Sequence, residues 1–276
     1  MNLGSLLLVA LVPTFSCDLV AAPPVHLFTT QDGLVRNWVH SIQRDREGML
    51  WFCTVDGLSI FDGKAFTNFT TRDGLPDRNV LDMVQTQTGE YWLGTGSGLV
   101  RFHPRAASGK HFEKVPLGSG RVAVWTLAED SAGNVWAGSN SGLYVLRKET
   151  GFRAEAVTLP GAPADSVLSL VEDSSKRLWI GTERGLFLHD IDRTPVQVGR
   201  EKGIRRVRAL LADRRGSVWV AGMKLTEITS AGGGHINFRD HPGIDKHHWL
   251  GVHALAEDDK GQIWIGGFGL QRFDPQ

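Results

Sequence analysis

The sequence predicts an all-β fold, a β-propeller of six four-stranded antiparallel blades. Short runs of β-branched and aromatic residues alternate with Gly, Asp, Asn and Ser, and no stretch keeps the 3.6-residue period of a helix. A repeat period of about 40 to 45 residues is typical of propellers, in which each repeat forms one blade. Tryptophan recurs in the chain with spacings of 41, 44, 43, 40 and 45 residues, at Trp51, Trp92, Trp136, Trp179, Trp219 and Trp264.

The composition excludes one class of partner. The chain has 276 residues, and its 30 Lys and Arg residues equal its 30 Asp and Glu residues. Because the formal net charge is zero, no overall field attracts the protein to a polyanion. We therefore expect no nucleic-acid partner.

Residues 1–22 differ from the rest and are predicted to be a signal peptide. Leu3 to Val12 is an apolar run of the length of a signal-peptide core, and the small residues Ala21 and Ala22 offer a cleavage site. The propeller then occupies residues 23–276. After cleavage it is expected to have no membrane-spanning segment and to lie in the periplasm or outside the cell. The alternative is a lipid anchor through Cys17. Removal of Cys17 leaves only Cys53, so no internal disulfide is expected.

Each repeat is predicted to form four strands, with tight turns after the first and second strands. In the second repeat, Val80, Met83 and Val84 begin the blade, Tyr91 to Leu93 follow a turn, and Gly98 to Phe102 form the third strand. Phe112 to Val115 supply the fourth strand. The pattern of short, β-branched and aromatic runs favours antiparallel hairpins in every repeat.

The turn before each tryptophan carries Asp six residues and Gly three residues ahead of it. An Asp side chain accepts hydrogen bonds from nearby backbone N–H groups, and Gly adopts a positive φ at little cost, so the pair predicts a tight hairpin turn rather than metal ligands. Thr86 replaces Asp in the second repeat and Lys176 replaces Gly in the fourth, so those two turns are expected to be less tightly specified. The regular positions are Asp45, Asp130, Asp173, Asp213 and Asp258, with Gly48, Gly89, Gly133, Gly216 and Gly261.

A small residue stands two positions after each tryptophan. Residues i and i+2 share one face of a strand, so the small residue lets the neighbouring blade approach beside the indole. Gly94, Gly138, Gly181 and Gly266 hold this position, with Cys53 and Ala221 in the other two repeats. Cys53 is therefore expected to be a small buried hydrophobe rather than a nucleophile.

The two ends of the chain predict how the array closes. The last repeat stops after its third strand, at Leu270 to Phe273, whereas residues 25–34 resemble the fourth strand of the first repeat, residues 66–75. Pairing the N-terminal strand with the last blade would complete six blades and cover both open edges. The alternative is a seven-bladed ring cut short.

The unit from Val167 to Leu186 resembles the two-component regulator propeller repeat, and all six copies match it to some degree over residues 25–274. The resemblance implies an extracytoplasmic sensory module of bacterial membrane-bound sensor kinases, often in sugar-responsive systems. No kinase region follows, so the chain itself is not expected to be an enzyme. Its partner would be a membrane sensor kinase or a continuation of the same polypeptide. Streptogramin-lyase and lactonase propellers are a weaker resemblance.

The unlike loops ahead of each first strand are the predicted ligand site, because they converge at one end of a propeller. Arginine side chains and flat aromatic rings there suit a carbohydrate, an oligosaccharide or another small polar molecule. The same residues could instead dock a protein partner, or simply plug the channel. The candidates are Arg36, Asn37, Trp38, Arg78, Asn79, Arg121, Arg205, Arg206, His248 and Trp249.

No cofactor or metal site is expected. His247 and His248 are adjacent, so on a strand they point to opposite sides and rarely bind one ion. The other histidines show no ligand spacing. A lyase- or lactonase-type propeller enzyme is the less favoured alternative.

Overall fold

The computed structural model describes residues 26–275 except 108, 119, 163, 191–192, 231–234, 242–251 and 268. The predicted signal peptide, its alternative anchor Cys17, and the loop with His247, His248 and Trp249 lie outside the described residues. No helix in the described part of the chain combines the length and apolarity needed to cross a membrane.

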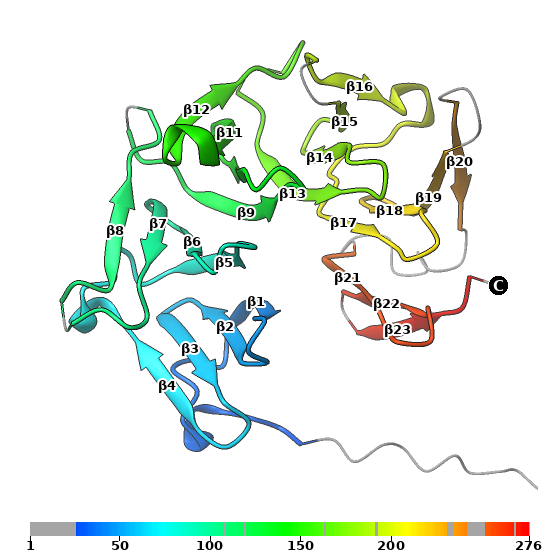
Figure 1. Cartoon of the computed structure of the whole chain (residues 1–276). Coiled ribbons are helices and arrows are strands. Elements are labelled where there is room, and N and C mark those ends of the chain that lie inside the picture. Colours follow the sequence, from blue (N-terminus) through cyan, green and yellow to red (C-terminus); the bar gives the residue numbers. More distant parts are fainter. Residues whose placement is uncertain are drawn as a thin grey trace, which may run out of the picture.

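Six antiparallel sheets stand around a common centre, which confirms the predicted six-bladed β-propeller (Figure 1). Blade 1 holds β1 (Val39–Arg44), β2 (Leu50–Thr54), β3 (Gly57–Phe61) and β4 (Phe66–Phe69). Blade 2 holds β5 (Val80–Gln85), β6 (Tyr91–Thr95), β7 (Gly98–Phe102) and β8 (Phe112–Val115). Blade 3 holds β9 (Val124–Glu129), β10 (Val135–Ser139), β11 (Gly142–Arg147) and β12 (Arg153–Val157).

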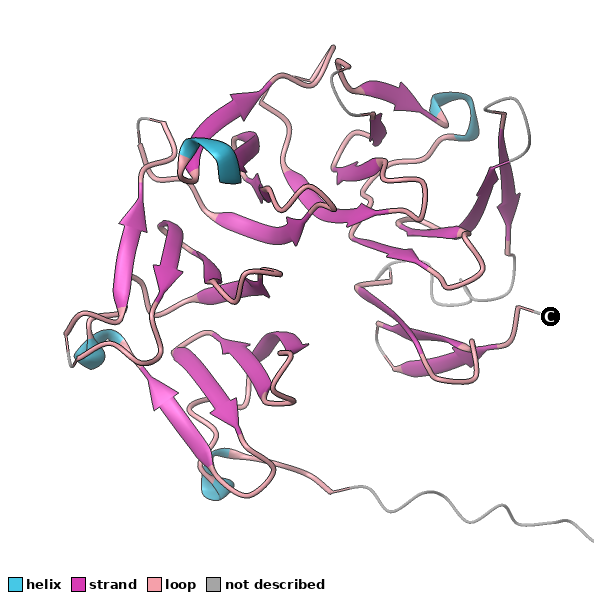
Figure 2. Cartoon of the chain, in the orientation of Figure 1, coloured by secondary structure: helices cyan, strands magenta, loops and turns pink. Residues whose placement is uncertain are grey.

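The second half repeats this pattern. Blade 4 holds β13 (Val167–Glu172), β14 (Leu178–Thr182), β15 (Leu186–His189) and β16 (Val196–Val198). Blade 5 holds β17 (Ala209–Ala212), β18 (Val218–Ala221), β19 (Leu225–Ser230) and β20 (Ile236–Asp240), and blade 6 holds β21 (Ala254–Glu257), β22 (Ile263–Gly266) and β23 (Leu270–Phe273). The helices of the described residues are four 3₁₀ turns: η1 (Thr30–Asp32), η2 (Thr71–Asp73), η3 (Lys148–Thr150) and η4 (Arg200–Lys202) (Figure 2).

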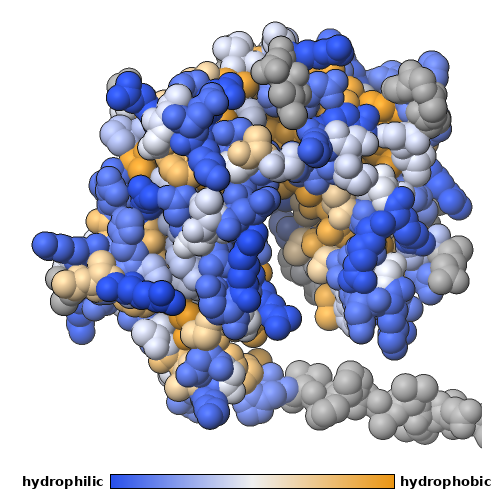
Figure 3. Space-filling model, in the orientation of Figure 1, coloured by the Kyte–Doolittle hydropathy of each residue, from blue (hydrophilic) through white to orange (hydrophobic). Residues whose placement is uncertain are grey.

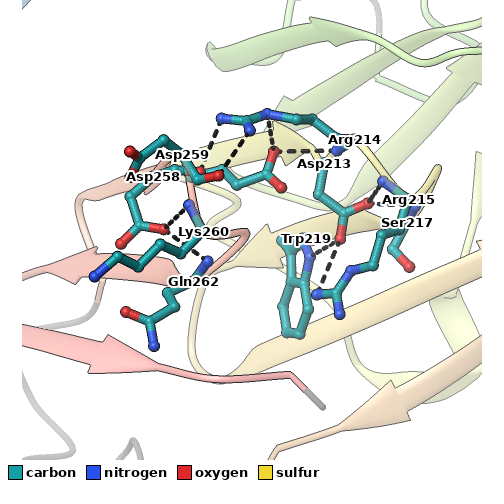
Figure 4. Close-up of polar contacts among 10 residues, drawn as sticks. Asp213, Arg214, Arg215, Ser217, Trp219, Asp258, Asp259, Lys260 and Gln262 are labelled. Atoms are coloured by element: carbon teal, nitrogen blue, oxygen red, sulfur yellow. Dashed lines mark hydrogen bonds and ion pairs between the residues drawn. The ribbon is translucent and has the colours of Figure 1, made fainter.

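The predicted Asp turn is confirmed, and blade 5 shows how it works (Figure 4). Asp213 accepts hydrogen bonds from the backbone N–H groups of Arg215 at 3.0 Å and Ser217 at 2.8 Å. Its other oxygen accepts from the indole Nε1 of Trp219 at 2.9 Å. The same Asp–indole bond recurs in blades 1, 3, 4 and 6 at 2.8 to 2.9 Å. The carboxylate thus ties the turn to the buried tryptophan.

Blade 2 shows the cost of the missing Asp. Thr86 Oγ1 accepts from the backbone N–H of Glu90 at 3.0 Å, so the turn still closes. The indole Nε1 of Trp92, however, is buried and has no hydrogen-bond partner among the described residues. Blade 2 therefore keeps the closed turn but lacks the bond between turn and indole.

The glycine two positions after the tryptophan meets the next blade in blades 2, 3 and 4, as predicted, whereas Gly266 of blade 6 meets Ala254 of its own blade. A methyl group added at Gly181 would lie 2.6 Å from Val207 Cγ1, and one at Gly138 would lie 2.6 Å from Val167 Cγ1. Such contacts are shorter than van der Waals distance, so the close approach of the blades requires glycine at these positions.

The predicted closure by an N-terminal strand is wrong for the described residues. Residues 26–29 form no strand, and blade 6 has three strands. The segment that resembles residues 66–75 instead forms η1, where the Asp32 side chain accepts from Thr29 N at 2.8 Å; Asp73 does the same for Thr70 at η2. This local capping box satisfies the backbone groups that an added strand would need. The sequence likeness therefore encodes the turn that enters a blade.

Among the described residues, blades 6 and 1 do not pack face to face as the other neighbouring blades do. Ile42 of β1 is 56% exposed, whereas Met83, at the same position of blade 2, is 3% exposed. On the other side, Leu270 of β23 is 69% exposed, whereas its counterpart Leu58 in blade 1 is fully buried. Hydrophobic residues are visible along the hollow between the two blades (Figure 3). These two sheet faces have the apolar residues of a blade interface but do not cover each other.

Candidate functional site

Two sets of loops meet at one end of the ring. The first strand of each blade runs antiparallel to the second, so Val39 pairs with Thr54 and Val80 pairs with Thr95. The loop into each first strand therefore lies beside the turn between the second and third strands. We call this end of the propeller the rim.

Arg36 and Arg78 come from the loops into blades 1 and 2 and share one carboxylate. Arg36 lies 2.6 Å from Asp56 Oδ2, and Arg78 lies 3.4 Å from Asp56 Oδ1. Asp56 belongs to the turn between β2 and β3. Because two guanidinium groups face one carboxylate, this cluster keeps one net positive charge and leaves N–H donors open to solvent.

Trp38 and Asn79 lie close to this cluster. The Trp38 side chain is 69% exposed, and its backbone carbonyl accepts from Val55 N at 3.4 Å, next to Asp56. Asn79 Oδ1 contacts His40 Nε2 at 2.8 Å, so its amide is held toward blade 1. The backbone of the exposed Trp38 thus lies next to the turn that carries Asp56.

Asn37 has a structural role. Its Oδ1 accepts a hydrogen bond from Thr30 N at 2.8 Å, which fixes the start of η1. This hydrogen bond shapes the loop ahead of blade 1.

Arg121 and Arg206 each pair with the blade before their own. Arg121 donates from Nε to Gly96 O at 3.1 Å and lies 3.3 Å from Asp77 Oδ2. Arg206 lies 3.5 Å from Glu183 Oε2 and has a φ of +53°. These two side chains therefore link neighbouring blades.

Arg205 is exposed and has no ion pair among the described residues. His248 and Trp249 lie outside them, so their place at the rim stays a prediction. The sequence reasoning missed the carboxylates Asp56, Asp77 and Glu183. Asp56 and Glu183 lie in turns between second and third strands, whereas Asp77 directly precedes Arg78 in the loop into blade 2.

A buried carboxylate lies on the inner strands. Asp82 of β5 accepts from Ser41 Oγ at 2.9 Å and from the backbone N–H of Leu127 at 2.9 Å, and so joins blades 1, 2 and 3. Burial raises the pKa of Asp82, and hydrogen bonds from Leu127 and Ser41 oppose this shift. Its oxygens are used for contacts between blades.

Cys53 is buried in the core of blades 1 and 2. Burial raises the pKa of its thiol well above the usual range, and the nearby Asp82 carboxylate adds to this effect. The thiolate is therefore disfavoured, and the prediction of a small buried hydrophobe is confirmed. Among the residues with described positions, no three His, Cys, Asp or Glu side chains group together to hold a metal ion.

Four segments match the family model described as "Two component regulator propeller": residues 33–56, 118–141, 161–184 and 249–269. The segments fall on four of the six tryptophan repeats. The recognition made from the unit at Val167 to Leu186 is confirmed. A search among curated proteins found no match to the chain.

Solved structures share the fold. The extracellular domain of a hybrid two component system from B. thetaiotaomicron is 19% identical with a TM-score of 0.69, and the match covers 88% of this chain and 40% of that one. The extracellular domain of a one component system from the same organism is 20% identical with a TM-score of 0.59, covering 86% of this chain and 40% of that one. This chain thus spans less than half of either domain.

An enzyme also shares the architecture. Virginiamycin B lyase from Staphylococcus aureus, in a catalytically inactive form with quinupristin, is 13% identical with a TM-score of 0.68. The match covers 85% of this chain and 79% of the lyase. At such identities, the structural likenesses show the fold alone.

Proposed function

Since the chain carries repeats of the two component regulator propeller family, we propose that it is a non-catalytic, ligand-binding sensory propeller. Its ligand in this proposal is a carbohydrate or another small polar molecule. The protein would lie in the periplasm or outside the cell, with anchoring through Cys17 as the alternative. It would act with a membrane sensor kinase or as the input part of a longer polypeptide.

The observation that carries the proposal is the exposed Trp38 beside the cluster of Arg36, Asp56 and Arg78. A sugar ring presents one apolar face and several hydroxyl groups. The apolar face stacks on an indole, while hydroxyls donate to a carboxylate and accept from guanidinium groups. The cluster offers both kinds of partner within one patch.

The differences between repeats also support this location. The tryptophans, turn aspartates and small residues recur because they pack the blades, and so they serve the scaffold. The rim residues differ from blade to blade. Specificity on a regular scaffold usually resides in such loops.

Calorimetry with a panel of neutral and acidic oligosaccharides tests the proposal. We expect one or more to bind the wild-type protein, and Arg36→Ala combined with Arg78→Ala to weaken that affinity at least about tenfold. Arg239→Ala, on the exposed outer strand β20, is the matched control and should leave affinity unchanged. No binding by any member of the panel, or equal loss in the control, would count against the proposal.

The exposure of Trp38 also favours a second candidate, the docking of a protein partner at the rim. Trp and Arg are frequent anchors of protein interfaces. This candidate predicts that Trp38→Ala abolishes capture of a partner from periplasmic extract, while oligosaccharides give no calorimetric signal. Unchanged capture by Trp38→Ala would argue against docking through this surface.

A further inference from the structure

A cavity of about 440 Å³ opens between blades 3 and 4, at the end of the ring opposite the rim. It lies beside the hairpin turns of the two blades, with Trp136 and Leu178 in its wall. Sites for small molecules typically measure about 300 to 1,000 Å³. The cavity therefore has the size of a ligand site.

His189 is the first residue that sets this interface apart. The same strand position holds Phe61, Phe102, Leu146, Ile228 and Phe273 in the other five blades. In blades 2, 3, 5 and 6 this side chain packs with the tryptophan of the preceding blade, as Phe102 does on Trp51 at 5.7 Å. His189 keeps that contact, with its ring centre 5.2 Å from Trp136, but brings a polar ring into the apolar position.

Two positions that hold aromatic residues at the interface of blades 1 and 2 hold smaller residues in blade 4. At the interface of blades 1 and 2, Tyr91 stacks on Trp51 at 4.7 Å, and Phe112 stacks on Phe102 at 4.9 Å. Blade 4 has Leu178 in the place of Tyr91. Pro195 takes the place of Phe112. Phe112 pairs with Phe102, and Pro195 is the residue next to the pair of Leu188 and Val196, on the side of His189. At the interface of blades 1 and 2, these two aromatic rings fill the corresponding space.

Lys176 is the second unusual residue, and its side chain also lines the cavity. It has a φ of +62° in the turn where the other five blades use glycine, with φ between +77° and +89°. A left-handed conformation is strained for a residue with a side chain. Strain of this kind is a reason to look for a function at the position.

The lining carries the carboxylates Asp130 and Glu172 and the cations Arg147, Lys176 and Arg193. Asp130 already accepts from Asn134 and Trp136, and Glu172 accepts from the backbone N–H of Ser131 at 3.0 Å. Arg147 lies 3.5 Å from Glu155. In contrast, Lys176 and Arg193 have no ion pair with any described residue. Burial lowers the pKa of His189, so its ring is neutral at neutral pH.

We propose that this cavity binds a small organic anion, a carboxylate carried on a flat or ring-shaped body. Lys176 and Arg193 hold the carboxylate by charge-assisted hydrogen bonds. The ring lies against Trp136 and His189, in the space that aromatic residues fill at the interface of blades 1 and 2. The site is separate from the rim and does not depend on the function proposed there.

Benzoate and glucuronate serve as probes in calorimetric titration, with benzyl alcohol and glucose as their neutral counterparts. We expect at least one carboxylate to bind and its neutral counterpart not to bind. The proposal would be overturned if both carboxylates failed to bind at millimolar concentration. It would also be overturned if the neutral compounds bound equally well.

Two variants locate the binding. Lys176→Gly introduces the residue that the other turns have, so it should raise the melting temperature. The same change should weaken the affinity for the carboxylate at least about tenfold. His189→Phe restores an aromatic residue and should block the cavity without loss of fold. Lys114→Gln, on the exposed face of β8, and Arg36→Ala, at the rim, are the controls. Unchanged carboxylate affinity in both Lys176→Gly and His189→Phe would contradict the proposal.

Discussion

At the scale of single residues, the repeats differ in whether the N–H group of the buried indole has a hydrogen-bond acceptor. Five tryptophans donate to a turn aspartate, and Trp92 has no acceptor among the described residues because Thr86 replaces that aspartate. A buried donor without a partner costs about 1 to 3 kcal/mol. Blade 2 therefore contains a defect that one substitution can repair.

Thr86→Asp should raise the free energy of unfolding by about 1 to 2 kcal/mol, because the new carboxylate accepts from Trp92 Nε1 and still closes the turn. Urea denaturation of the two proteins at neutral pH measures the change. Thr67→Asp, on the exposed strand β4, is the control for added charge and should not stabilise. A Thr86→Asp midpoint at or below the wild-type value would show that the indole is already satisfied.

The turn carboxylates also predict a dependence on pH. The hydrogen bond from the Trp264 indole, followed by that from Gln262 N–H, holds the pKa of Asp258 below its ordinary value of 3.8. A depressed pKa means that the charged form stabilises the folded state. This contribution is complete above about pH 4 and is lost as the pH falls through the folded-state pKa.

Asp258→Asn should therefore melt at a lower temperature than wild type near neutral pH, and the difference should shrink in acid. Melting curves of both proteins, recorded from neutral pH down to about pH 3, test this. Asp259→Asn, the exposed neighbour, is the control and should change little at any pH. A difference that stays constant across the range would mean that ionisation of Asp258 contributes nothing.

At the scale of elements, local turn chemistry could be read from the sequence and long-range pairing could not. Asp213 and Gly216 act through residues four or fewer positions away, apart from the Asp bond to Trp219, so their spacing predicts the hairpin. The resemblance of residues 25–34 to residues 66–75 was equally local. It reflects the capping boxes at Thr29 and Thr70, and it contains no information on which sheet edge the chain reaches.

The open faces of blades 1 and 6 predict unequal costs for matched substitutions. Met83→Ala should destabilise by about 2 to 5 kcal/mol because Met83 is buried between blades. Ile42→Ala, at the corresponding place in blade 1, should cost clearly less because most of its side chain already meets water. Chemical denaturation of both variants gives the comparison. Equal losses would indicate that another surface covers Ile42 in solution.

At the scale of the whole molecule, the repeats determine the scaffold and the exceptions to them mark the candidate sites. The sequence predicted that rim arginines converge, but not their pairing. Arg78 reaches Asp56 of blade 1, and Arg121 reaches Asp77 of blade 2. Such pairs depend on how neighbouring blades are placed, which spacing along the chain does not determine.

The cavity between blades 3 and 4 was missed for a related reason. Lys176 was noticed as an exception in its turn, and His189 was one histidine among ten. Only the alignment of strands in space shows that both line one hollow beside Trp136. Comparing the third-strand position across the blades could have identified His189 from the sequence.

Binding of a polar ligand at the rim beside Trp38 can be observed directly in a two-dimensional NMR spectrum of the indole N–H groups. The spectrum is recorded during titration with an oligosaccharide found to bind, with Trp38→Phe used to assign the Trp38 signal. We expect the Trp38 signal to move with the ligand while those of Trp51, Trp136, Trp179 and Trp219 stay in place. Saturable binding that leaves the Trp38 signal unmoved would contradict this expectation.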